Sequence, residues 1–226
     1  IGIPEAFEVA PFDHLNSVWW ITALLRLRGI TSAQVPVVSS HPFEEIPDLD
    51  GRPSLWPMEE SETRVIYNPD QEPEITADDL RWIDTYWEHA IELTSVEDFR
   101  TAFEALDGSM RISDPNLALV MLWGGLERIL PPERASGFRR SAYLASFLRS
   151  SGEDRLELQK EIKDLYGTRS NAAHGGRPDD YVPVARAHEI LRRVLLKIIR
   201  KGEIPSRDEL EQNLFAGSKA NANGSQ

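Results

Sequence analysis

The chain has 226 residues, no cysteine and a formal net charge of −12 at pH 7. Its length suits one sizeable core, or one domain with an elaborate extension. The lack of cysteine excludes disulfides, thiolate chemistry and cysteine-ligated zinc, and no apolar run is long enough to span a bilayer. We therefore expect a cytoplasmic protein without a membrane partner.

The charge is unevenly distributed along the chain. Residues 1–110 contain 22 acidic and 6 basic residues, a net charge of −16, whereas residues 111–226 contain 15 acidic and 19 basic residues, a net charge of +4. The overall acidity argues against a general nucleic-acid coat, which would be basic. The mildly basic second half is compatible with a local anion site.

Residues 1–75 predict an irregular N-terminal extension with a few short strands. Within it, residues 13–29 predict a first helix or a short helix–strand junction. Seven prolines between residues 30 and 74 exclude long helices. Only residues 34–38 and 63–67 have the composition of short strands.

Residues 76–217 predict an all-α, up-and-down helical bundle, and the polar tail over 218–226 is too simple to fold. Helices are expected to start at residues with capping chemistry, namely Thr76, Ser95, Asp114 and Ser206. Residues 184–201 form the last long helix of the prediction, with one continuous apolar face.

Residues 112–130 are expected to form the most buried helix, because the run PNLALVMLWGGLERIL is apolar on nearly every side. Gly124 and Gly125 each weaken a helix by about 1 kcal/mol relative to alanine. Two glycines in such a helix indicate close approach by a neighbouring helix.

Glu127 is the one carboxylate of this apolar helix. A partly buried carboxylate needs a hydrogen-bond donor or a cation, and Arg169 is a candidate. The alternative is that Glu127 simply faces water near Arg128.

Residues 153–176 predict a long amphipathic helix that ends at Gly175 and Gly176, because glycine adopts positive φ without steric cost. The expected apolar positions recur at spacings of three and four and are Leu156, Leu158, Ile162, Leu165, Tyr166, Ala172 and Ala173. Arg169 and His174 lie near its C-terminal end, where cationic side chains favour the helix dipole.

Arg169 and His174 have two interpretations, a simple helix cap or a functional site. Five residues along an ideal helix turn through about 500°, so the two side chains point about 140° apart. They can meet on one ligand only if the helix unwinds at Gly175 or if two copies bring their helix ends together.

The motif YGTRSNAAHGG resembles the Arg-x4-6-His motif of the HEPN superfamily, and most closely that of its Apea-like branch. The run ALVMLWGGLE is similar to the aliphatic helix ending in Leu-Glu that precedes the motif helix in that branch. The resemblance covers about residues 76–202 and says little about the N-terminal extension. In HEPN motifs the residue after arginine is usually polar; Ser170 satisfies this, although Asn or Asp is commoner, and Asn171 follows one place later.

The resemblance implies a helical bundle that dimerises along the motif helix and forms a composite cleft from both copies. In catalytic members this cleft is the active site of a ribonuclease that needs neither a metal ion nor a cofactor. The implied catalytic residues are Arg169 and His174, with Ser170, Asn171, Glu127 and Tyr166 in supporting roles.

The expected function is therefore a HEPN-type endoribonuclease that cleaves single-stranded RNA to 2′,3′-cyclic phosphate and 5′-OH ends, in defence or stress. A histidine can exchange the protons of this reaction near neutral pH, and an arginine can bind the phosphate. The alternatives are a non-catalytic HEPN module that binds RNA, a nucleotide or a regulatory protein partner, and an unrelated helical interaction protein.

Overall fold

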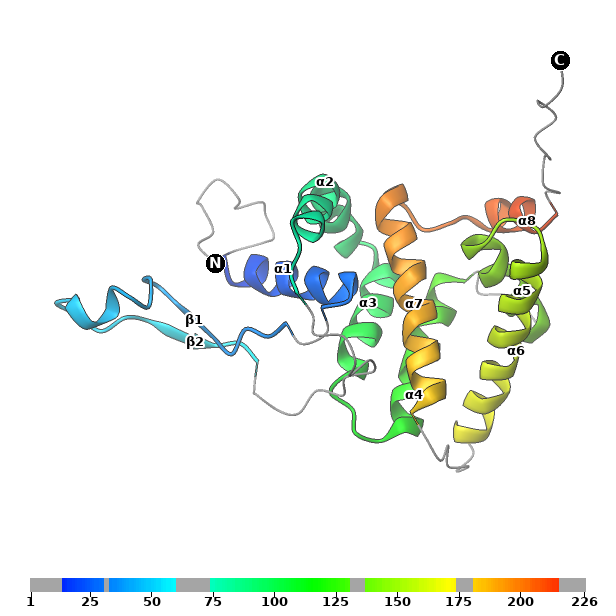
Figure 1. Ribbon diagram of the computed structural model, residues 1–226, viewed down its shortest axis with the longest axis horizontal. Helices are drawn as coiled ribbons and strands as arrows, with labels where there is room; N and C mark the ends of the chain where they lie inside the picture. Colours follow the sequence, from blue (N-terminus) through cyan, green and yellow to red (C-terminus); the bar gives the residue numbers. More distant parts are fainter. Residues whose placement is uncertain (1–13, 31–32, 60–73, 131–136, 174–180, 216–226) are drawn as a thin grey trace, which may run out of the picture. The chain divides into compact units, whose positions relative to one another are not determined.

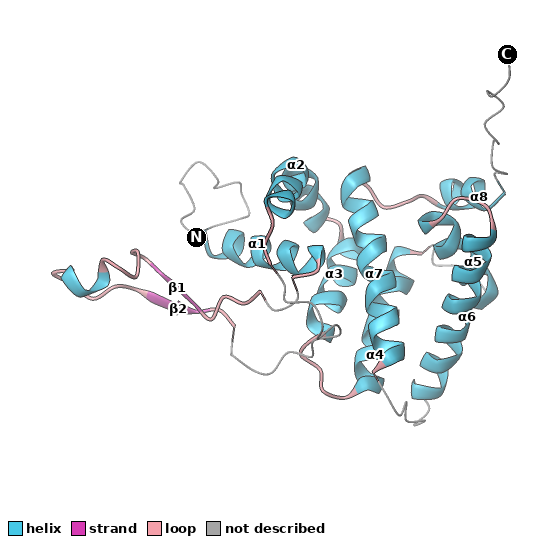
Figure 2. Cartoon of the chain, viewed as in Figure 1, coloured by secondary structure: helices cyan, strands magenta, loops and turns pink. Residues whose placement is uncertain are grey.

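The computed structural model describes residues 14–30, 33–59, 74–130, 137–173 and 181–215 (Figure 1). Across these residues it contains eight α-helices, one short 3-10 helix and one sheet of two strands (Figure 2). The expected all-α class, with a short strand-containing N-terminal region, is confirmed.

The chain divides into two compact units, Ile1–Thr85 and Tyr86–Gln226. This division falls inside α2, which runs from Ala77 to Thr94. The division expected after residue 75 stays a prediction, and the expected tail lies outside the described residues.

The first unit contains α1 (His14–Arg28), β1 (Val37–Ser39), the 3-10 helix η2 (Ile46–Asp48) and β2 (Leu55–Pro57). Of the two alternatives for residues 13–29, a first helix or a short helix–strand junction, the structure has the helix. β1 and β2 pair antiparallel, with Val38 opposite Trp56. β1 overlaps the strand predicted over 34–38, whereas β2 was not expected because a Pro-flanked Leu-Trp pair is too short to show strand alternation.

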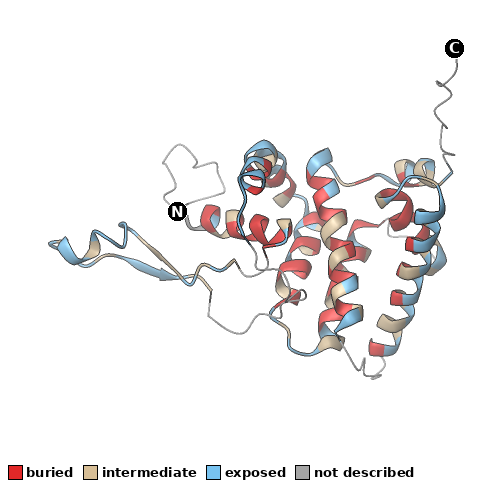
Figure 3. Cartoon of the chain, in the orientation of Figure 1, coloured by how far each residue is buried: buried red, intermediate tan, exposed pale blue. Residues whose placement is uncertain are grey.

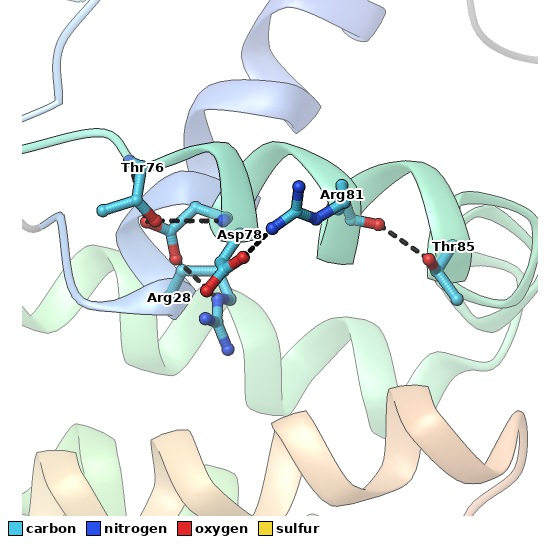
Figure 4. Close-up of polar contacts among 6 residues, drawn as sticks. Arg28, Thr76, Asp78, Arg81 and Thr85 are labelled. Atoms are coloured by element: carbon cyan, nitrogen blue, oxygen red, sulfur yellow. Dashed lines mark hydrogen bonds and ion pairs between the residues drawn. The ribbon is translucent and has the colours of Figure 1, made fainter.

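The start of α2 is fixed by the predicted capping box (Figure 4). The backbone N–H of Asp79 donates to Thr76 Oγ1 at 3.2 Å, and the backbone N–H of Thr76 donates to Asp79 Oδ2 at 3.1 Å. Arg28 Nε donates to Asp79 Oδ1 at 2.9 Å and so ties α1 to α2 within the first unit. Burial alone would raise the pKa of Asp79, but the hydrogen bonds from Thr76 and Arg28 lower it overall, which keeps the carboxylate ionised.

The second unit is a helical bundle. Its further helices are α3 (Glu97–Ser109), α4 (Pro115–Ile129), α5 (Gly137–Leu148), α6 (Glu153–Ala173), α7 (Val182–Lys201) and α8 (Arg207–Phe215). α4 packs against α3, α6 and α7, while α5 packs against α6, α7 and α8. Buried residues lie on α3, α4, α5 and α7, where these helices contact one another (Figure 3).

α4 starts as the sequence predicts. Asp114 Oδ1 accepts hydrogen bonds from the backbone N–H groups of Asn116 and Leu117 at 2.8 and 3.1 Å. However, Leu117 itself is 58% exposed, so α4 is not buried on every side. α4 buries seven of its 15 residues and α5 seven of its 12, so the expectation that residues 112–130 form the most buried helix is wrong.

The two glycines of α4 differ in their surroundings. A Cβ atom on Gly125 would lie 2.9 Å from the Cβ of Ala105 on α3 and 3.0 Å from Leu191 Cδ2 on α7. A Cβ atom on Gly124 would have nothing within 4 Å. The predicted close approach of neighbouring helices is therefore confirmed at Gly125 and wrong at Gly124.

The other two predicted caps also differ. Ser206 caps α8, because its Oγ accepts from the backbone N–H of Glu209 at 3.2 Å. Ser95 does not cap α3; its hydroxyl donates back to the carbonyl of Glu92 at 2.6 Å, and Val96 takes the N-cap position without a side-chain hydrogen bond. The Ser95 hydroxyl thus forms a local hydrogen bond with the end of the preceding helix instead of capping the following one.

α8 is attached to the bundle mainly through polar groups. Glu211 accepts hydrogen bonds from Arg139 Nη2 at 2.8 Å and from the Tyr143 hydroxyl at 3.1 Å, both on α5. Arg155 Nη1, on α6, donates to the carbonyl of Asn213 at 3.1 Å. Within α8 the one buried residue is Leu210.

Candidate functional site

The motif residues lie at the end of α6, which begins at the predicted Glu153 and is described as far as Ala173. The helix is seated by buried apolar side chains at four of the predicted positions, namely Leu158, Ile162, Leu165 and Ala172. Leu156 was expected on this face but is 52% exposed, because it lies in the first turn, before the buried stripe begins. Tyr166 is half-buried.

His174, Gly175 and Gly176 lie outside the described residues. Their relation to Arg169, including the divergence of about 140°, therefore stays a prediction. Of the supporting residues, Ser170 is half-buried and Asn171 is exposed.

The predicted contact between Arg169 and Glu127 is present. Arg169 Nη2 lies 3.8 Å from Glu127 Oε2, and the two side chains are 27% and 29% exposed. This distance supports a coulombic attraction but is too long for a hydrogen bond. The Nε of Arg169 is buried and has no hydrogen-bond partner among the described residues. The guanidinium is thus only weakly engaged.

Glu127 has a second and closer partner that the sequence did not reveal. Arg140, on α5, donates from Nη1 to Glu127 Oε1 at 2.6 Å. The alternative in which Glu127 faces water near Arg128 is wrong, since Arg128 turns to the first turn of α3 and pairs with Glu97 and Asp98. The sequence carries no signal for Arg140, because two adjacent arginines, Arg139 and Arg140, belong to no recognisable motif and nothing in the chain tells which of them meets Glu127.

Tyr166 connects these side chains to the bundle. Its ring lies 5.5 Å from the ring of Trp123 between centroids, at an interplanar angle of 54°. The guanidinium carbon of Arg140 lies 5.9 Å from the Tyr166 ring centroid, within the range of a cation–π contact. A Cβ atom on Gly137 would lie 2.8 Å from Tyr166 Cδ1, so only glycine leaves room for the ring there.

Arg140, Glu127 and Arg169 therefore form a small charged cluster at the junction of α5, α4 and α6. Two guanidinium groups share one carboxylate, which leaves a formal charge of +1. Each of the three side chains is between 25% and 29% exposed, so solvent and a solute can reach all of them. Arginines in such a setting can bind an oxyanion, because guanidinium groups present planar arrays of donors.

Among the histidines of the described residues, His188 has a resolved pKa shift. Burial, reinforced by the positive charge of Arg192, lowers the pKa of His188 from 6.5 to about 4, although Glu189 and Asp107 oppose this effect. His188 is therefore neutral near pH 7 and sits in the core of α7. Its position gives it a structural role and no part in the Arg140–Glu127–Arg169 cluster.

The described residues contain no group of three or more His, Asp or Glu side chains arranged to hold a metal ion. None of the helices in the described ranges has both the length and the apolar character to cross a membrane. No family model, curated protein or solved structure matches this chain. The resemblance to HEPN proteins therefore rests on the motif residues and on the helix that precedes them.

Proposed function

We propose that the chain is a metal-independent endoribonuclease of HEPN type, which cleaves single-stranded RNA to 2′,3′-cyclic phosphate and 5′-OH ends in defence or stress. The observation that supports this proposal best is the state of Arg169. Its side chain is 27% exposed, its Nη2 lies 3.8 Å from Glu127 Oε2, and it stands five residues before His174 in the chain. An arginine so weakly engaged is available to a phosphate.

The proposed chemistry uses two groups of the motif. His174 accepts the proton of the ribose 2′-OH as the 2′-oxygen attacks the adjacent phosphorus and the bond from phosphorus to the 5′-oxygen breaks. The proton held by His174 then passes to the leaving 5′-oxygen, directly or through water, which restores the neutral imidazole. Arg169 binds the phosphate oxygens, whose negative charge grows in the transition state. DNA is not a substrate, because it lacks the 2′-OH.

We also propose a homodimer in which the C-terminal ends of the two α6 helices meet near the two-fold axis. The expected divergence of Arg169 and His174 on one regular helix supports this arrangement. A composite cleft would supply each phosphate with an arginine and a histidine in suitable directions.

A second candidate is a non-catalytic HEPN-like module that binds RNA, a nucleotide or a regulatory protein. The contact of Arg169 with Glu127 favours it, since this pair links α6 to α4 and thus gives Arg169 a structural role. The two candidates differ in whether His174 is needed for RNA cleavage.

The test compares cleavage of a fluorescent single-stranded RNA by wild type and variants, with excess EDTA present. His174→Ala is expected to abolish cleavage. Arg169→Ala should cost about 3–4 kcal/mol of transition-state stabilisation, by analogy with loss of an oxyanion donor. Ser170→Ala should cost only about 1 kcal/mol. Arg186→Ala is the matched control, because Arg186 pairs with Glu161 on the surface and lies outside the cluster.

The outcomes separate the candidates. Cleavage that depends on His174 and Arg169 but not on Arg186, by a species of dimer mass in light scattering, supports the ribonuclease. Equal cleavage by wild type and His174→Ala would indicate a contaminating nuclease or another site. RNA binding without cleavage by any variant would favour the binding module.

A further inference from the structure

We propose that Arg140 and Arg169 form a two-arginine site for one phosphodiester group of single-stranded nucleic acid, and that Glu127 is the internal counter-ion that this phosphate displaces. The choice of ligand class rests on the proposed function. The roles of Arg140 and Glu127 rest on the geometry of the cluster.

The carboxylate of Glu127 occupies the place that a phosphate would take. Its Oε1 accepts from Arg140 Nη1 at 2.6 Å, and its Oε2 faces Arg169 Nη2 at 3.8 Å. Each carboxylate oxygen of Glu127 thus faces a different guanidinium group. A phosphodiester also has two non-bridging oxygens on one centre, so it can make the same pair of contacts.

The charge of the cluster favours this exchange. Two arginines and one glutamate leave one positive charge uncompensated, and within the described part of the second unit no other carboxylate forms an ion pair with Arg140 or Arg169. Because the three side chains are partly exposed, a phosphate can approach without opening the core. Glu127 holds Arg169 at 3.8 Å and Arg140 at 2.6 Å, so an incoming phosphate displaces Glu127 from Arg169 first.

Arg140 is held in position for this role by Tyr166. The cation–π contact at 5.9 Å and the tight fit of the Tyr166 ring over Gly137 limit the movement of the guanidinium. A guanidinium group that is already oriented loses less conformational entropy when it binds an anion. Its neighbour Arg139 points elsewhere, since it pairs with Glu211 at 2.8 Å.

Fluorescence anisotropy can test the site without any cleavage. The probe is a labelled single-stranded deoxyoligonucleotide, which has phosphodiesters but no 2′-OH. Glu127→Gln is expected to tighten binding about threefold to tenfold, because it removes the competing anion. Arg140→Gln is expected to weaken binding about tenfold. Arg139→Gln and Glu161→Gln are the matched controls and should change the affinity less than about twofold.

A double variant distinguishes binding by Arg140 from mere neutralisation of Glu127. If Arg140 contacts the phosphate, Arg140→Gln must still weaken binding in the Glu127→Gln background. This background also avoids leaving Glu127 unpaired, so the comparison holds even if Arg140→Gln alone fails to fold. If Arg140→Gln no longer weakens oligonucleotide binding in the Glu127→Gln variant, the proposal is overturned. It is also overturned if Glu127→Gln alone binds the oligonucleotide with the affinity of wild type.

Inorganic phosphate as a second probe separates the two sources of the anion. Competition by free phosphate only at concentrations far above that of the oligonucleotide is expected if the site recognises a phosphodiester within a strand. Equal affinity for free phosphate would overturn the assignment to nucleic acid. The results do not depend on catalysis: binding that follows these variants, without RNA cleavage by wild type, would retain the site and reject the ribonuclease.

Discussion

The contrast between Gly125 and Gly124 gives the sharpest test of how the bundle is packed. Both glycines are in α4, and alanine at either position gains about 1 kcal/mol of helix propensity. At Gly124 nothing lies within 4 Å of the new Cβ atom, so this gain is kept. Gly124→Ala is therefore expected to stabilise the protein by up to about 1 kcal/mol.

At Gly125 the same methyl group meets three atoms from two helices. Its Cβ would lie 2.9 Å from Ala105 Cβ, 3.0 Å from Leu191 Cδ2 and 3.3 Å from the backbone Cα of Ala102. Leu191 can change its side-chain conformation, but the Cα of Ala102 moves only with α3. Overpacking of this kind costs about 1–3 kcal/mol, which offsets or outweighs the propensity gain. After the propensity gain of about 1 kcal/mol is subtracted, we expect Gly125→Ala to destabilise the protein by up to about 2 kcal/mol.

Urea denaturation followed by circular dichroism measures both variants. With a slope of about 2 kcal/mol per molar urea, the midpoints of the two variants should differ by about 1 M, and the slopes should be unchanged. Equal midpoints, or a higher midpoint for Gly125→Ala than for wild type, would refute the close packing of α3 and α7 against α4.

Two further predictions concern the core. Leu122→Asp should unfold the second unit, because Leu122 is fully buried and an unpaired charge there costs several kcal/mol; loss of the helical signal checks this, with Leu122→Met as a control that should remain folded. His188 should make the protein less stable as the pH falls. Its folded pKa of about 4 lies below the unfolded value of 6.5, so the unfolded chain binds the proton first, and stability that is complete above pH 6.5 declines until about pH 4. Between pH 7.5 and pH 5 this loss amounts to about 2 kcal/mol in urea unfolding, and it should be absent in His188→Gln; an identical loss in that variant would assign the effect to other groups.

The bundle was predictable from local chemistry in the sequence. Caps at Thr76, Asp114 and Ser206 depend on hydrogen bonds between residues three apart or closer, and all three are present. The apolar face of α7 was likewise predicted correctly from its spacing. Its six expected residues are all buried, namely Ile190, Leu191, Val194, Leu195, Ile198 and Ile199. A sequence shows such features directly, since each depends on one segment.

The features that the sequence did not give depend on which segments meet. Gly124 and Gly125 look alike in the chain, and only the positions of α3 and α7 distinguish them. The pairing of Glu127 with Arg169 was a candidate because Arg169 belongs to a recognisable motif, whereas Arg140 belongs to none and was missed. The prediction of His174 as the second group of the motif is untested by the described residues.

Because α8 is attached mainly by polar contacts, it should open more easily than the other helices of the second unit. α8 buries a single leucine and is otherwise held by charged and polar contacts at Glu211, Asn213 and Glu209. Salt screens such contacts, whereas it does not screen the apolar contacts of α4 and α7. The amide hydrogens of α8 would thus exchange with solvent through a local detachment that costs much less free energy than global unfolding. The bundle can release this helix while its core stays closed.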